Sequence, residues 1–325
     1  MRKFCIFPYL VLGFSLAIFS GLVSCGSAGS ERSSDQQVSR QTSENQKLKV
    51  LATTTIVADV VAQIGGEAIE LVVLLPPGTD PHTFDPAPQD VASVADAQVV
   101  FANGAGLEEF LEPLLESAGA ENKVIYLSEG IPLLQFDGVH DEDNPEHGNE
   151  NADPHTWTDP NNILIWVNNI EQAISELDPN NSDLYKQNAE IYAAEIKELD
   201  AWIREQVEQI PIESREIITD HVQFAYFAEE YGFNQIGAII SGYSTLAEPS
   251  AQELASLEDA IKEYNVKAIF VGKTVNPSLA NRIAADTGIQ IVFLYTGSLT
   301  EKGGEADTYL DYIRYNVSAI VNALQ

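Results

Sequence analysis

Short apolar runs alternate along the chain with segments in which apolar residues recur every three or four positions. The short runs occupy 48–53, 69–75, 98–102 and 123–127, and then 216–219, 235–240, 267–271 and 290–295. Segments with helical spacing lie between them, for example 56–63, 107–117 and 251–264, with a last one at about 306–323. This alternation predicts parallel sheets flanked by helices. We therefore expect an α/β fold of two lobes, each with a parallel four-stranded sheet.

One long segment with helical spacing separates the two series. Pro179-Asn180-Asn181-Ser182 provides a break and an N-cap, and apolar residues then recur at Tyr192, Ile196, Leu199, Ile203, Val207 and Ile210. At 1.5 Å per residue, a helix from about 183 to 209 would be roughly 40 Å long. That length is enough to join two lobes as a rigid connection, although an ordinary surface helix with a broken end fits the same periodicity.

The N-terminus follows a different pattern. Arg2 and Lys3 precede an apolar run from Phe4 to Val23, which ends at Leu22-Val23-Ser24-Cys25. A run this long could remain as a transmembrane anchor, but a small residue directly before a cysteine resembles the lipobox of bacterial lipoproteins. We expect residues 1–24 to be a lipoprotein signal peptide and Cys25 to carry a lipid anchor. The polar stretch 25–47 is then a flexible tether.

The folded region divides at the long helical segment. We expect an N-terminal lobe at 48–178, which contains an acidic, histidine-bearing loop at 139–152, a linking helix at 179–210 and a C-terminal lobe at 211–325. Cys5 leaves with the signal peptide, so the exported domain has no disulfide and depends on core packing.

Acidic residues dominate the charge of the chain. There are 49 Asp and Glu against 17 Lys and Arg, for a formal net charge of −32. Removal of residues 1–24 takes away two cations and no acids, which leaves 15 cations against 49 acids, or −34. A surface of this sign disfavours nucleic acid and anionic lipid as partners and attracts cations.

Three of the five histidines occupy similar positions in the predicted topology. His82, His155 and His221 each lie at a strand-to-helix junction or in a long loop, and the first two follow Asp-Pro. Ligands of α/β proteins bind beyond the carboxyl ends of the strands. A single loop histidine is usually only solvated, but three in such positions predict convergence on one metal ion. The neighbouring acids could orient the rings; they are Asp80, Asp85, Asp153, Asp159 and Asp220.

Seven motifs between Leu48 and the C-terminus occur in a fixed order: "LATTTIVADVVAQIGG", "LLPPGTDPHTFDPAPQD", "FANGAGLEEFLEPLL", "DPHTWTDP", "ITDHVQFAYFAEEYG", "EPSAQELASL" and "NPSLANRIAADTGIQIVFLY". Together they resemble the metal-binding subunits of bacterial ABC importers for zinc and manganese, the ZnuA-like family. The resemblance implies two lobes joined by a long rigid helix, with the metal between them. It places His82, His155 and His221 on three of four ligand positions. It also implies a monomeric, lipid-anchored protein outside the cytoplasm that delivers its metal to a membrane permease.

The third and fourth ligand positions bear on the metal. Zinc-type members of the family have a histidine at the third position, as His221 is here, whereas manganese-type members have a carboxylate. The resemblance therefore favours Zn2+ over Mn2+. At the fourth position Gly297 stands where the family has aspartate, and Gly272 stands where glutamate is common. We expect three histidines plus solvent; the alternatives are a substitute ligand among Glu301, Glu305 and Asp307, or a weakened site.

The acidic loop carries two further histidines. His140 and His147 lie in "VHDEDNPEHGNENAD", which resembles in short form the histidine- and acid-rich loop of zinc-type members. Either the loop is an auxiliary zinc collector, or it is a disordered acidic surface loop.

Two other classes of function remain open from the residues alone. Three histidines with an open position also describe the catalytic zinc of hydrolases, but the chain has no HExxH or GxSxG motif, and we expect no enzymatic activity. A surface adhesin lipoprotein would have the same tether, but it would leave the three histidines without a role.

Overall fold

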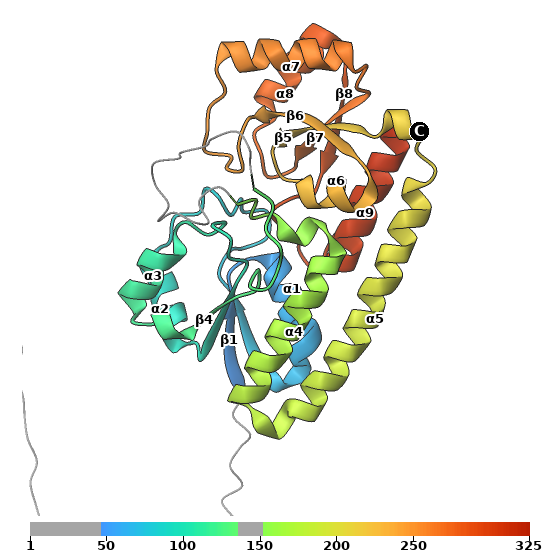
Figure 1. Cartoon of the computed structure of the whole chain (residues 1–325). Coiled ribbons are helices and arrows are strands. Elements are labelled where there is room, and N and C mark those ends of the chain that lie inside the picture. Colours follow the sequence, from blue (N-terminus) through green and yellow to red (C-terminus); the bar gives the residue numbers. More distant parts are fainter. Residues whose placement is uncertain (1–46, 136–151) are drawn as a thin grey trace, which may run out of the picture. The chain divides into compact units, whose positions relative to one another are not determined.

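The computed structural model describes residues 47–135 and 152–325, which contain two parallel four-stranded sheets with the same strand order (Figure 1). The first sheet consists of β1 (Leu48–Ala52), β2 (Ile69–Val73), β3 (Val99–Ala102) and β4 (Val124–Tyr126), in the order β2-β1-β3-β4. The second consists of β5 (Glu216–His221), β6 (Asn234–Ile240), β7 (Ala268–Gly272) and β8 (Gln290–Leu294), in the order β6-β5-β7-β8. Each strand lies within two residues of its predicted range, and the predicted α/β fold is confirmed.

Helices cover both faces of the first sheet. Val50 and Phe101 point to a core that includes α1 (Thr55–Gly65) and α4 (Pro160–Leu177). Leu51 and Val100 point the other way, to a smaller core beneath α2 (Pro88–Asp96) and α3 (Leu111–Ala118). Because neighbouring residues of a strand face opposite sides, strands buried on both faces read as continuous apolar runs.

The second sheet is covered in the same way. Ile217 and Phe270 face α6 (Ala225–Tyr231) and α9 (Tyr309–Leu324), whereas Ile218 and Ile269 face α7 (Ala251–Glu263) and α8 (Ser278–Thr287). The final helix α9 follows the last strand in the sequence, but it contacts both α1 and α5.

The long helix α5 (Ser182–Val207) lies alongside α4 and also reaches α9 (Figure 1). Its buried stripe joins the inner faces of both sheets in one continuous core; the stripe consists of Tyr185, Ala189, Tyr192, Ile196, Leu199, Ile203 and Val207. We call this the shared core. The two sheets thus have separate outer cores but a common inner one, which the alternation of strands and helices did not predict.

Two further observations concern individual helices. The segment predicted as helical from 107 begins as α3 only at Leu111, because the side chain of Glu108 turns inward and accepts hydrogen bonds from the N–H groups of Asn103 and Gly104. The predicted signal peptide, Cys25 and nearly all of the tether lie outside the described residues. In the part of the chain that the structure describes, no helix combines the length and apolar character needed to cross a bilayer.

Candidate metal site

The structure brings His82, His155 and His221 together at the ends of three separate segments. His221 is the last residue of β5, His82 lies in the loop after β2, and His155 directly precedes a short 3₁₀ helix (Thr156–Thr158) that leads to α4. The Nε2 atom of His155 lies 3.2 Å from Nε2 of His82 and 3.2 Å from Nε2 of His221. All the potential ligand atoms lie within 4.8 Å of one another. His155 and His221 are buried, and His82 is half-buried.

The repeated Asp-Pro-His sequence forms the same turn twice. The backbone N–H of His82 donates to Asp80 Oδ1 at 3.0 Å, and that of His155 donates to Asp153 Oδ1 at 2.9 Å. An aspartate that accepts from the backbone two residues later is a common way to fix a tight turn. The repeat therefore has a structural cause: it presents each imidazole from a fixed backbone.

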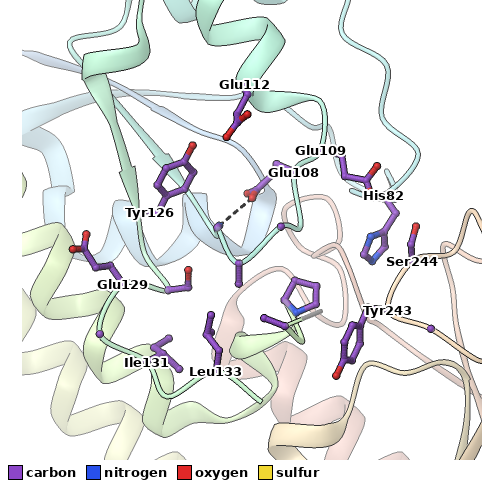
Figure 2. A pocket seen from close by; sticks show the side chains of 18 of the residues that line it. His82, Glu108, Glu109, Glu112, Tyr126, Glu129, Ile131, Leu133, Tyr243 and Ser244 are labelled. Atoms are coloured by element: carbon purple, nitrogen blue, oxygen red, sulfur yellow. Dashed lines mark hydrogen bonds between the residues drawn. The ribbon is translucent and has the colours of Figure 1, made fainter. Parts of the chain in front are cut away.

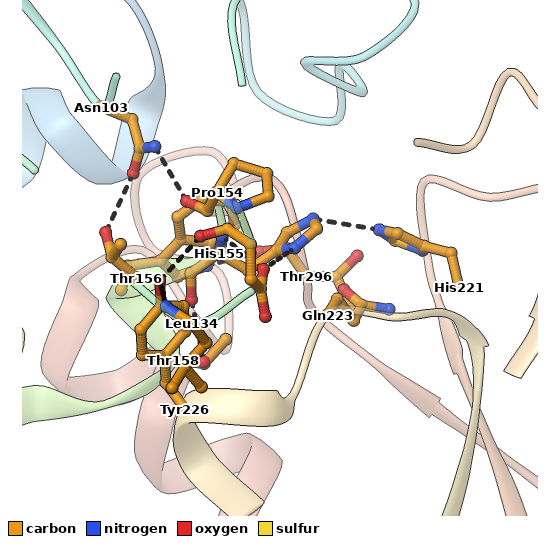
Figure 3. A network of polar contacts seen from close by, with 12 residues as sticks. Asn103, Leu134, Pro154, His155, Thr156, Thr158, His221, Gln223, Tyr226 and Thr296 are labelled. Atoms are coloured by element: carbon orange, nitrogen blue, oxygen red, sulfur yellow. Dashed lines mark hydrogen bonds and ion pairs between the residues drawn. The ribbon is translucent and has the colours of Figure 1, made fainter. Parts of the chain in front are cut away.

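Carboxylates hold two of the three rings. Asp153 Oδ1 lies 2.7 Å from Nδ1 of His155, and Asp220 Oδ1 lies 2.5 Å from Nδ1 of His221. A histidine that donates its Nδ1–H to a carboxylate keeps the proton on Nδ1 and offers the lone pair of Nε2. Figure 3 shows the rings of His155 and His221 meeting at their Nε2 atoms.

The other three acids that were predicted to orient the rings make no hydrogen bond to a histidine ring. Asp80 holds the backbone of His82 and accepts from the hydroxyl of Thr245 at 2.6 Å, but it does not contact the ring. Asp85 is exposed, and Asp159 caps α4 by accepting from the N–H of Asn161. The prediction was wrong for these three because sequence proximity does not determine where a carboxylate points.

Burial favours the neutral form of two of the three rings, His82 and His155. Burial lowers the pKa of His82 to about 2, with a further contribution from the charges that His155 and His221 would carry. Burial also holds the pKa of His155 well below its usual range, and it raises the pKa of Asp153 to about 7. The Nε2 atoms of His155 and His221 face each other at 3.2 Å, and a cation between them would accept a lone pair from each.

Residues from other segments, among them Asp80, Gln223 and Thr245, complete the lining around the three histidines. The three histidines line a cavity of about 10 Å³ together with Pro81, Thr296 and Gly297. This is close to the smallest volume that holds one water molecule. Among the described residues, no carboxylate belongs to the ligand group.

None of the three acids considered as substitute ligands belongs to the ligand group. Asp307 accepts from the N–H of Gly303, and Glu305 lies 3.8 Å from the ammonium group of Lys273. Glu301, also considered, is exposed and lies outside the ligand group. The alternative in which one of them replaces the missing aspartate is therefore wrong in this structure.

A larger cavity of about 1060 Å³ opens beside His82. Glu109, Glu112, Glu129 and Tyr243 are among the residues that line it (Figure 2). Carboxylates around a concave surface raise the local concentration of cations. His140 and His147 lie outside the described residues.

Several residues that support the site were not predicted. Asn103 donates to the carbonyl of Pro154 at 2.9 Å and accepts from the hydroxyl of Thr156 at 3.4 Å, so it holds both neighbours of His155 (Figure 3). The hydroxyl of Tyr226 donates to the carbonyl of Asp153 at 2.8 Å. The position of Asn103 directly after a predicted strand was the available signal.

Comparison with known proteins gives consistent results. The family model described as "Zinc-uptake complex component A periplasmic" matches residues 50–323. The manganese-binding lipoprotein MntA of Halalkalibacterium halodurans is 32% identical over 100% of this chain and 99% of its own. The manganese ABC transporter substrate-binding lipoprotein PsaA of Streptococcus pneumoniae is 32% identical over 96% of this chain and 98% of its own.

Solved structures agree with these relatives. The periplasmic zinc-binding protein TroA from Treponema pallidum has a TM-score of 0.75 and 25% identity, over 86% of this chain and 99% of its own. A manganese-bound periplasmic metal-binding protein from Candidatus Liberibacter asiaticus has a TM-score of 0.74 and 26% identity, over 86% and 100%. These proteins bind solutes, which confirms the prediction that the chain is not an enzyme. The chain belongs to the zinc-uptake complex component A family, the substrate-binding proteins of metal ABC transporters.

Proposed function

We propose that this protein captures Zn2+ with His82, His155 and His221 and delivers it to an ABC permease in the membrane. The observation that carries the proposal is the spacing of the Nε2 atoms, 3.2 Å for two of the three pairs. Tetrahedral zinc with bonds of 2.0–2.1 Å requires nitrogen ligands roughly 3.3 Å apart. The rings lie close to that separation.

The donor atoms favour zinc over manganese. Imidazole nitrogen suits zinc, whereas Mn2+ prefers carboxylate, carbonyl and water oxygens, and the ligand group contains three imidazoles and no carboxylate among the described residues. Import of Mn2+ is the second candidate, because the relatives MntA and PsaA are named for manganese. TroA is named for zinc.

Capture and release follow from the chemistry of the rings. Cations collect in the acidic cavity beside His82, and the lowered pKa values of His82 and His155 mean that these two rings can bind an ion without first losing protons. Asp153 and Asp220 keep Nδ1 protonated, so that Nε2 faces the metal. Release requires one ligand to move away from the metal. His82 is half-buried and lies on a loop, whereas His155 and His221 are buried, so we expect His82 to move first.

The setting of the protein is part of the proposal. Lipidation of Cys25 would hold the monomer at the membrane outside the cytoplasm, as in the lipoprotein relatives. Residues 48–178 and 211–325 would act as the two lobes, with 179–210 between them.

Titration of metal-free protein tests the metal and its ligands. We expect one Zn2+ per chain by calorimetry, with tighter binding than Mn2+. Single replacements His82→Ala, His155→Ala and His221→Ala should each abolish tight binding. Tight zinc binding that survives all three replacements, or tighter binding of Mn2+ than of Zn2+, would contradict the zinc proposal.

The acidic loop provides the matched control. His140→Ala and His147→Ala should leave the affinity of the main site unchanged, and so should deletion of residues 139–152. A slower rate of zinc loading in the deletion variant would support the role of an auxiliary collector. Loss of tight binding there would show that the loop supplies a ligand.

A further inference from the structure

Gly297 lies where the loop after β8 meets the loop that carries His82. A Cβ atom at position 297 would lie 2.6 Å from Cδ of Pro81 and 3.2 Å from its Cγ. Non-bonded carbon atoms make favourable contacts at 3.5–4.0 Å, so the first distance is a severe clash. The absence of a side chain at 297 therefore allows Pro81 to approach this closely.

Pro81 transmits this contact to the metal site. It is buried and directly precedes His82, whose Nε2 lies 3.2 Å from that of His155. The proline ring is closed on its own backbone and cannot turn away as a flexible side chain would. A side chain at 297 must therefore push apart the two loops that meet here, and one of them carries His82.

The same loop has a second tie to the region after β8. The N–H of Gly78 donates to Oγ of Ser298 at 2.8 Å, and Ser298 is buried. A second glycine, Gly272 at the end of β7, donates its N–H to Oδ2 of Asp220. The other oxygen of this carboxylate lies against Nδ1 of His221. A Cβ at 272 would lie 2.4 Å from Oγ1 of Thr296.

We infer that Gly297 is a positioning residue for His82 and a determinant of metal specificity, because the packing of Pro81 against it leaves no room for a carboxylate side chain at position 297. This inference rests on the proposed function. The three imidazoles are then the only chain ligands among the described residues, a donor set that suits zinc better than manganese.

A double-mutant cycle tests the positioning role. Gly297→Ala should weaken zinc binding at least tenfold. Pro81→Ala removes the Cγ and Cδ atoms that the new methyl group would meet, so the variant P81A/G297A should recover most of the loss. Gly242→Ala is the matched control, because a Cβ there meets nothing within 4 Å and should change the affinity less than twofold.

The possible outcomes distinguish failure of the inference about Gly297 from failure of the proposed zinc-binding function. Thermal unfolding of the metal-free variants is measured in parallel. If Gly297 had only a structural role, G297A would lower the melting temperature, and P81A would not restore the zinc affinity of G297A. Equal affinities of G297A and G242A, or strictly additive effects of P81A and G297A, would overturn the inference while wild-type binding upholds the proposed function. Absence of zinc binding by the wild type would overturn both.

Specificity has its own measurement. P81A/G297D offers both a carboxylate and room for it, so the ratio of the Mn2+ to the Zn2+ dissociation constant should fall at least tenfold relative to P81A. G297D alone lacks the room and should mainly weaken zinc binding. An unchanged ratio in P81A/G297D would overturn the role of Gly297 in specificity.

Discussion

Replacing Asp220 with asparagine tests whether His221 depends on the carboxylate behind its ring. Asp220 is 3% exposed. Its Oδ1 accepts from the backbone N–H and the Nδ1–H of His221 and from Nε2 of Gln223, while Oδ2 accepts from the N–H of Gly272. Asparagine has the same shape but only one oxygen, so its NH2 group must face at least one of these donors.

The magnitude follows from the least harmful orientation. If the amide oxygen takes the place of Oδ1, only the N–H of Gly272 loses its acceptor, and a buried unsatisfied donor costs about 1–3 kcal/mol. His221 then keeps a neutral acceptor in place of a charged one. Changes of this kind behind a metal-bound histidine typically reduce metal affinity by roughly 10–100-fold.

Isothermal titration with a competing chelator measures this effect. We expect Asp220→Asn to retain one zinc per chain with an affinity 10–100-fold lower, and urea unfolding of the metal-free variant to show the stability loss. Asp85→Asn is the control, because Asp85 is an exposed acid near His82 that holds no ring. Zinc affinity of Asp220→Asn within twofold of wild type, or an equal loss in Asp85→Asn, would refute the reasoning.

Four more predictions use independent measurements. Between pH 7.5 and 5.5, zinc affinity should fall by much less than the roughly 1,000-fold loss expected for three ordinary imidazoles. The reason is that burial lowers the pKa of His82 to about 2 and that of His155 well below its usual range, so protons hardly compete at these rings; a loss near 1,000-fold would contradict this. Leu199→Ala should reduce the free energy of unfolding by about 2–5 kcal/mol in denaturant titrations, with zinc stoichiometry unchanged. Free zinc at 100 times the dissociation constant should stabilise the protein by about 2.7 kcal/mol, and a chelator should reverse this; an unchanged melting curve would argue against a site in the folded state. Cys25→Ser should move the protein from the membrane fraction to the soluble fraction, and continued sedimentation with membranes would point to another anchor.

Local patterns predicted the fold because the central strands β1, β3, β5 and β7 are buried almost throughout and the helices have one apolar face. The continuous apolar sequences around Leu51 and Ile269 therefore indicated buried strands. The shared core was not predictable in this way. It arises because α5 and α9 pack against α1, and contacts between elements so far apart in sequence leave no local periodicity.

The candidate site was predictable in its histidines but not in its supporting contacts. His82, His155 and His221 could be selected by their positions after strands. Asp153 and Asp85 have similar sequence surroundings, yet only Asp153 holds a ring, because the direction of a carboxylate depends on the turn it belongs to. The resemblance to the family implied a missing ligand at Gly297, and the structure places the ring of Pro81 against that position.

The shared core bears on how this protein could be used as an optical zinc sensor. Two fluorophores, one over each sheet, would report a change in the distance between lobes. Such a change would expose the apolar side chains of α5 and α9 at about 1.5–3 kcal/mol for each large one. The energy transfer between the dyes should therefore hardly change on zinc binding. A single environment-sensitive dye at Thr83, which is exposed beside His82, should give the larger signal.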